Sequence, residues 1–201
     1  RRRAGVLLHP TSLPGGLGAA APQFVDWLAD GGFSVWQVLP LGPVGPDRSP
    51  YWSRADGAIN PQLIDWAEAP SAGQRANEFA AFCGQQSDWL EDYALFEVLA
   101  TAAAGRPWWH WPERLRDRDA TELAMARDRF APAIARICHE QWVASLQWQA
   151  LRAYAHERGI RLFGDLPIYA APDSAMVWSQ RAQFQLDERG LPRAVAGVPP
   201  D

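Results

Sequence analysis

The chain has 201 residues, of which 48% are hydrophobic, enough to bury a core in one or two domains. The formal net charge is −4, so the sequence lacks the clustered positive charge that nucleic-acid binding needs, and no nucleic-acid partner is expected. All 19 basic residues counted as Lys or Arg are arginine. The lack of lysine excludes P-loop nucleotide binding and Schiff-base or pyridoxal chemistry within this chain, because each of these needs a lysine amine.

The first 40 residues have the pattern of a strand, a helix and a second strand. Residues 6–8 form a short apolar run, helical spacing of apolar side chains spans residues 22–30, and residues 35–39 are again mostly apolar. A strand–helix–strand unit predicts a parallel sheet. Residues 40–61 then form a long proline-rich loop, and loops of this length in compact domains are usually functional or disordered. Its two large aromatic residues, Tyr51 and Trp52, argue against disorder.

The middle of the chain changes composition, because Ala, Arg, Glu and Gln dominate from about residue 76 to residue 158. Apolar periodicity predicts a helix ending near residue 103 and two further helices over 119–130 and 133–158. A third apolar strand is predicted at residues 160–163, followed by a short helix at 174–178. The pattern therefore indicates an α/β protein that carries a helical insertion.

Polar and aromatic side chains follow each of the three predicted strands. His9 follows the first strand, Ser49 and Tyr51 lie in the loop after the second, and Asp165 ends the third. Because the carboxyl ends of parallel strands meet at one edge, these residues are expected to converge on a cleft. Two alternatives remain open: Asp165 either lines the cleft or caps the following turn, and His9 either binds a ligand or hydrogen-bonds a neighbouring loop.

Other features of the sequence disfavour metal, cofactor and membrane chemistry. Cys83 and Cys138 form no CxxC pair, so two reduced thiols are favoured over a disulfide or a structural zinc site. No metal and no cofactor is expected. No apolar run approaches the ~18 residues of a membrane span and no signal peptide is evident, so a cytoplasmic protein without a membrane partner is expected. The tryptophan-rich segment 108–111 is interpreted either as a sugar platform or as aromatic packing between helices.

Several ordered motifs resemble the 4-α-glucanotransferases, also called amylomaltases or disproportionating enzymes. The motifs are GVLLHPTSLPG at 5–15, WQVLPLGP at 36–43, SPY at 49–51 with NP at 60–61, GDLPIY at 164–169, DSAMVW at 173–178 and VAGVPPD at 195–201. The insertion also matches, through its segment WWHWPERLRDR at 108–118. The likeness extends over essentially the whole chain.

The resemblance implies part of a (β/α)8 TIM barrel of the α-amylase superfamily with a helical insertion subdomain. Residues 1–70 are then expected to form the first βαβ part of the barrel with a long active-site loop. Residues 71–135 form the insertion, and residues 136–201 supply a barrel helix, the third strand and the loop region that follows. By the same likeness the substrate is a maltooligosaccharide or another α-1,4-glucan.

The resemblance also implies roles for four residues. Tyr51 is expected to stack on a sugar ring, Ser49 to hydrogen-bond glucan hydroxyls, and Asp165 to line the same pocket. Asp201 matches an acidic residue at the base of a loop over the site. All four are substrate-binding candidates, and none is a catalytic carboxylate.

The family's retaining chemistry needs a nucleophilic Asp, an acid/base Glu and a further Asp, and none of these has a counterpart among the 201 residues. The chain is therefore expected to be an N-terminal fragment that is inactive alone. The leading functional hypothesis is a 4-α-glucanotransferase. An α-glucan hydrolase of the same superfamily and a non-catalytic glucan-binding module are the alternatives.

Overall fold

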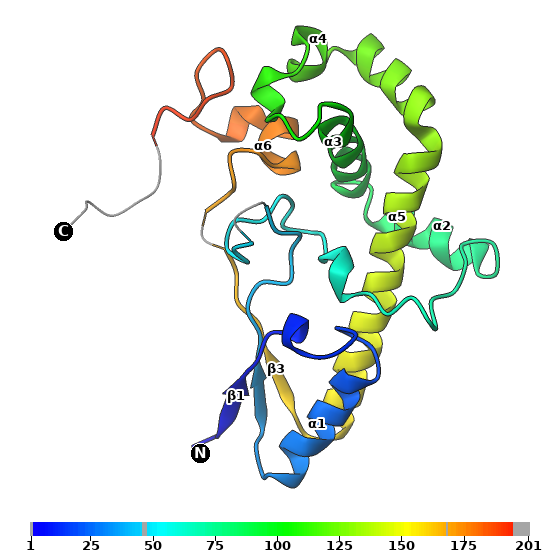
Figure 1. The fold of residues 1–201 in the computed structure, drawn as a ribbon, viewed down its shortest axis with the longest axis vertical. Coiled ribbons are helices and arrows are strands. Elements are labelled where there is room, and N and C mark those ends of the chain that lie inside the picture. Colours follow the sequence, from blue (N-terminus) through cyan, green and yellow to red (C-terminus); the bar gives the residue numbers. More distant parts are fainter. Residues whose placement is uncertain (1, 46–47, 168, 195–201) are drawn as a thin grey trace.

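The computed structural model describes residues 2–45, 48–167 and 169–194. Its strands are β1 (Gly5–Leu7), β2 (Val35–Gln37) and β3 (Arg161–Phe163). The α-helices in this part of the chain are α1 (Ala20–Asp30), α2 (Ala76–Gln85), α3 (Leu90–Ala102), α4 (Glu113–Arg116), α5 (Ala120–Glu157) and α6 (Ala175–Ser179). Short 3₁₀ helices are η1 (Pro10–Ser12), η2 (Pro61–Leu63), η3 (Trp108–His110) and η4 (Arg181–Gln183). Figure 1 shows the strands at one end of an elongated molecule and α3, α4 and α6 at the other.

The three strands form one parallel sheet in the order β1-β2-β3, as the sequence pattern predicts. Val6, Trp36 and Leu162 lie side by side across this sheet and face the same core. Helices α1 and α5 cover that face, and Val25 and Leu28 of α1 are fully buried against it. The Trp36 indole also donates a hydrogen bond to the Leu8 carbonyl at 2.8 Å, which fixes the end of β1 against β2.

No element of the described residues covers the opposite face of the sheet. Leu7 and Phe163 lie on it at the two outer strands, with exposed fractions of 54% and 60%. They share a row across the sheet with Gln37. Apolar residues on both faces are typical of strands in a parallel sheet that is covered on both sides.

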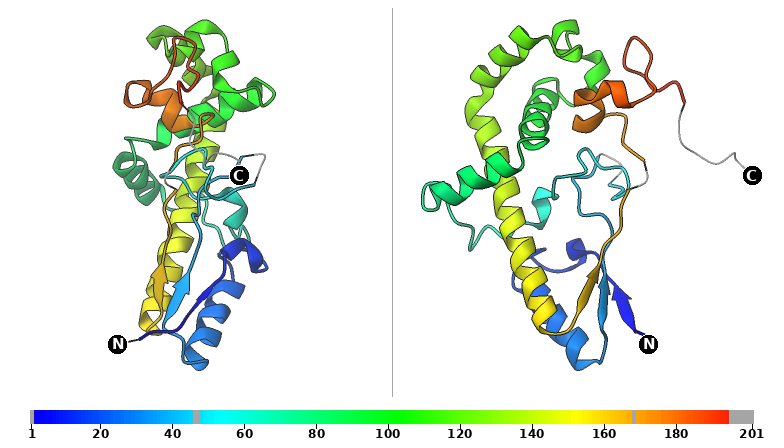
Figure 2. Two further views of the ribbon diagram at one scale, coloured as in Figure 1. Left: turned by 90° about the vertical axis from the view of Figure 1, so that its left-hand side faces the viewer. Right: turned by 180° about the vertical axis from the view of Figure 1, so that it is seen from behind.

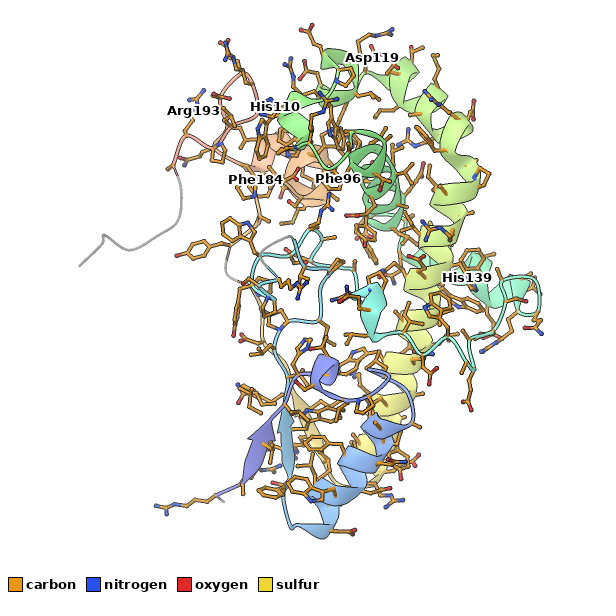
Figure 3. All side chains as sticks on the ribbon, viewed as in Figure 1. Phe96, His110, Asp119, His139, Phe184 and Arg193 are labelled. Carbon is orange, nitrogen blue, oxygen red and sulfur yellow. The ribbon has the colours of Figure 1, made fainter. Side chains whose placement is uncertain are left out.

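Helix α5 has 38 residues and runs along most of the molecule (Figures 1 and 2). Asp119 caps its first turn by accepting a 3.0 Å hydrogen bond from the Glu122 backbone N–H, and Figure 3 shows Asp119 at that end. At 1.5 Å per residue the helix is about 57 Å long. Among the described helices, none is both long enough and apolar enough to cross a bilayer.

The sequence pattern predicts two helices where α5 is one, and this expectation is wrong. Pro132 lies inside α5, where it has no N–H to donate to the preceding turn, a defect that usually ends or kinks a helix. The helix continues because both flanks are packed: Leu123 and Ala126 are buried on one side of Pro132, and Ile137 and Trp142 on the other. The predicted division of the chain at residue 135 falls within this helix.

The tryptophan-rich segment packs inside the helical end of the molecule. Trp108 is fully buried, and its indole donates a 2.8 Å hydrogen bond to the Pro172 carbonyl. Trp111 and the fully buried Trp178 stack edge to face, with ring centroids 5.5 Å apart. Phe96 of α3, labelled in Figure 3, has its ring centre 5.3 Å from that of Trp111 and 5.9 Å from that of Trp178. Trp108 and Trp111 therefore take the packing role, and the sugar-platform interpretation is not supported for them.

Two glutamines of α5 hold the long loop that follows β2. The Gln141 side chain accepts from the Ile59 N–H at 2.8 Å and donates to the Ile59 carbonyl at 2.9 Å. Gln147 makes the same pair of bonds with the backbone of Asp65, at 3.0 and 2.6 Å. Each amide thus satisfies both backbone polar groups of one loop residue, which the loop cannot pair within itself.

Replacing Gln141 by methionine, which keeps the shape and helix propensity of the side chain, should leave both polar groups of Ile59 unpaired. We expect the free energy of unfolding to fall by about 2 kcal/mol or more, measured by urea denaturation. The matched control is Gln149→Met in the same helix, where the side chain is exposed and should change stability by less than about 0.5 kcal/mol. Equal losses in the two variants would contradict the role given to Gln141.

Candidate active site

The residues after β2 and β3 meet at the carboxyl edge of the sheet. The Tyr51 hydroxyl donates a 2.9 Å hydrogen bond to Oδ2 of Asp165. The other carboxylate oxygen, Oδ1, accepts from the Leu166 N–H at 2.9 Å. The hydrogen bond to Asp165 raises the pKa of Tyr51, with smaller contributions from burial and from the charge of Asp165.

Asp165 makes contacts that fit both interpretations of its role. Its carboxylate caps the chain at Leu166 and also holds Tyr51, which is 114 residues away in sequence. The Tyr51 side chain remains 43% exposed, and the neighbouring Trp52 is 39% exposed. The site therefore presents aromatic surface to solvent beside a carboxylate whose oxygens are both hydrogen-bonded.

The loop that carries Tyr51 is anchored on both sides. Ser53 is buried, and its hydroxyl donates to the Ala55 carbonyl at 2.9 Å. Arg54 forms an ion pair with Glu97 of α3 at 3.3 Å, and its guanidinium lies 5.1 Å from the centre of the Phe96 ring. The Arg54 carbonyl accepts from the Ala175 N–H at 2.9 Å. The described part of this loop is thus ordered by contacts with α3 and α6.

His9 hydrogen-bonds its neighbours, which agrees with the structural interpretation of this residue. Nδ1 accepts from the Thr11 N–H at 3.3 Å and lies 2.7 Å from the Thr11 hydroxyl. Nε2 lies 3.3 Å from the Pro40 carbonyl oxygen, so the tautomer that fits carries its proton on Nε2. Burial lowers the pKa of His9, and the bond to Pro40 opposes this effect.

A cavity of about 760 Å³ opens beside His9 at the ends of β1 and β2. Residues from the segments that follow β1 and β2 line it: His9, Thr11, Leu39, Val44, Gly45, Arg48, Pro50, Asn60 and Gln62. Arg48 has a positive φ of 57°, a conformation that non-glycine residues adopt rarely and that occurs at functional sites. Nothing in the sequence around Arg48 signals this left-handed backbone.

Of the two remaining predicted site residues, the structure describes one. Ser49 lies two residues before Tyr51, and its carbonyl accepts from the Trp52 N–H at 3.2 Å. Asp201 lies outside the described residues. Within the described part of the chain, no group of three or more His, Cys, Asp or Glu side chains is arranged to hold a metal ion. Cys83 and Cys138 are both free thiols.

The pH dependence of stability should reveal the half-buried imidazole of His9. Its pKa in the folded chain lies below the ordinary value of 6.5, so the unfolded chain takes up the proton first as pH falls. The free energy of unfolding should therefore fall as pH is lowered through about 6.5. We expect His9→Gln to weaken this dependence in urea denaturation between about pH 7.5 and 5.5. His110→Gln, at an exposed position, is the control and should keep it.

Comparisons with known proteins agree on one family. A family model described as 4-alpha-glucanotransferase matches residues 8–72 and 66–201. The 4-alpha-glucanotransferase of Thermus thermophilus is 40% identical over an alignment that covers all of this chain and 49% of that protein. The Synechocystis 4-alpha-glucanotransferase is also 40% identical, with 50% of that protein covered.

A solved structure gives the same result for the fold. The amylomaltase from Streptococcus agalactiae, in complex with acarbose, superposes with a TM-score of 0.90 at 29% sequence identity. The match covers the whole of this chain and 50% of that one. The chain thus spans about half the length of the curated relatives it matches. With a family model that matches nearly every residue and relatives at 40% identity, the chain belongs to the 4-alpha-glucanotransferase family.

Proposed function

We propose that the protein containing this chain transfers α-1,4-glucan segments between maltooligosaccharides and that Ser49, Tyr51, Asp165 and Asp201 contact the substrate. The observation that carries the proposal is the hydrogen bond between Tyr51 and Asp165. It brings an exposed aromatic ring and a carboxylate together at the carboxyl edge of a parallel sheet, where ligands bind in barrels and open α/β sheets. Family membership supports the choice of glucan as the ligand.

We further propose that β1, β2 and β3 are the first strands of a (β/α)8 barrel. The uncovered sheet face supports this, since Leu7 and Phe163 are apolar and lie where the interior side chains of such a barrel lie. In this arrangement residues 1–70 and 136–201 belong to the barrel and residues 71–135 to the helical insertion, with α5 shared by both. The two free thiols favour a cytoplasmic location, where cysteines stay reduced.

Within this proposal Asp165 positions Tyr51. With its oxygens bonded to the Tyr51 hydroxyl and the Leu166 N–H, the carboxylate fixes the phenol ring at the edge of the sheet. The exposed ring can then stack on a sugar, a contact worth roughly 0.5–1.5 kcal/mol beyond the apolar area that it buries. Retaining transfer also needs two carboxyl groups about 5–5.5 Å apart and an acceptor hydroxyl in place of water. We assign that pair to the part of the relatives that this chain does not span.

Two alternative functions make different products. The intact protein should convert maltotriose into glucose and longer maltodextrins if it transfers glucan segments. An α-glucan hydrolase would release glucose and maltose without longer products. A non-catalytic binding module would leave maltotriose unchanged, so chromatography of the products distinguishes all three.

Substitution of Tyr51 tests its place in the site. Tyr51→Ala removes both the ring and the bond to Asp165, and we expect the transfer efficiency kcat/KM of the intact protein to fall about tenfold or more. Tyr51→Phe keeps the ring and loses only the hydroxyl, so its loss should be smaller. An unchanged kcat/KM in the alanine variant would remove Tyr51 from the proposed site.

The 201-residue chain made alone should transfer no glucan, because we place the nucleophile and the acid/base residue outside it. The test incubates the purified chain with maltotriose and looks for glucose and longer maltodextrins. Circular dichroism of the same sample, which should show helix, separates an inactive folded chain from an unfolded one. Products above a no-protein control would mean that the catalytic carboxylates lie among these residues.

A further inference from the structure

A second cavity lies between α3 and α5, away from the strand ends. Its volume is about 380 Å³, within the range of small-molecule sites. One face of each helix lines it, together with Pro61 at the start of η2, and its acidic and phenolic groups are Tyr93 and Glu97 of α3 and Glu140 of α5. Pro132 lies in α5 between Phe130 and Ala133, which both line this cavity.

The Tyr93 hydroxyl is the most informative group of this cavity. Tyr93 is only 3% exposed, and its hydroxyl has no hydrogen-bond partner among the residues that the structure describes. Burial raises the pKa of Tyr93, and the charges of Glu97, Arg54 and Glu140 also act on it. Its hydroxyl end therefore lies near the carboxylates of the cavity and stays protonated. The hydroxyl oxygen is not among the fully buried side-chain atoms that lack a partner, so it opens to the cavity, where it can bond a hydroxyl group of a ligand.

Two carboxylates accompany this hydroxyl. Oε1 of Glu97 and Nε of Arg54 form an ion pair with each other at 3.3 Å, and neither atom makes a hydrogen bond within the described part of the chain. Glu140 pairs with Arg136, whose side chain is 65% exposed at the mouth of the cavity. Each carboxylate thus faces one guanidinium, and the cavity is close to neutral overall. This balance favours an uncharged ligand with hydroxyl groups over a multivalent ion.

The remaining wall is apolar. Val98, Ala102, Phe130, Ala133 and Ile137 contribute it, and the Thr101 hydroxyl is already bonded to the Glu97 carbonyl at 2.8 Å. A hexose fits a cavity that has one apolar wall and one polar wall, because its C–H groups form an apolar face while its hydroxyls surround the ring. The carboxylates can accept from those hydroxyls, and the Tyr93 hydroxyl can donate to one.

We propose that the cavity between α3 and α5 binds one hexose unit of an α-glucan, as a non-catalytic site separate from Tyr51 and Asp165. The choice of α-glucan rests on the proposed function, whereas the preference for a neutral polyhydroxyl ligand rests on the cavity itself. The site would hold glucan on the helical part of the molecule, apart from the edge of the sheet where transfer is proposed.

The test is hydrogen–deuterium exchange of the intact protein titrated with maltose, which localises binding along the chain. We expect protection in α3 and in residues 130–140, in addition to any protection around residues 49–54. Tyr93→Phe should raise the maltose concentration for half-maximal protection of α3 about fivefold, the effect of one lost hydrogen bond. Tyr154→Phe is the matched control, since its hydroxyl bonds Asp26 outside the cavity, and should leave that concentration unchanged.

A second variant tests the same cavity in case Tyr93→Phe does not fold. Ala133→Leu fills the cavity from the α5 wall with apolar volume and should abolish the protection of α3 by maltose. Absence of that protection in the wild-type protein, or equal protection in Tyr93→Phe and wild type, would overturn the proposal. Protection by ethylammonium ion in place of maltose would overturn it too, because the ligand would then be a cation. If maltose protects α3 but the intact protein does not convert maltotriose, the proposed binding cavity is supported and the proposed transfer activity is contradicted.

Discussion

Helix α5 is the constraint on which the rest of the structure depends. Its C-terminal half supplies Leu151 and Ala155 to the core beneath the sheet, and its N-terminal half packs Leu123 and Ala126 against the other helices. Between these regions Gln141 and Gln147 hold the long loop by its backbone. Sheet, loop and helical end therefore share one rigid element. A change in their relative position requires α5 to bend, and Pro132 is where a backbone hydrogen bond is already missing.

The sequence predicts the sheet well because its signal is local. The three strands, α1 and α6 follow from short apolar runs and helical spacing, and the structure confirms them within a few residues. Pro132 misleads the same reasoning, since local propensity ends a helix there while burial of Ile137 and Trp142 continues it. The sequence of segment 108–111 is compatible with two roles, and only the tertiary contacts of Trp108 decide between them.

The candidate site is predictable in position and less so in detail. Parallel strands share a carboxyl edge, so the proximity of Tyr51 and Asp165 follows from topology. The bond between them does not, because it depends on how a long loop returns to the sheet. The backbone conformation of Arg48 and the pairing of Gln141 with Ile59 also lie beyond sequence patterns. Each depends on contacts between residues that are far apart along the chain.

The loop after β2 is made long before the residues that hold it. Gln141 follows Ile59 by 82 residues, and Asp165 follows Tyr51 by 114. During synthesis on the ribosome, the loop therefore emerges with its anchoring backbone groups open to water, and it cannot reach its final form until α5 and β3 have followed. Closing such long spans costs chain entropy before any contact rewards it. The contact that holds Tyr51 at the edge of the sheet therefore becomes possible only after the chain has been made as far as Asp165.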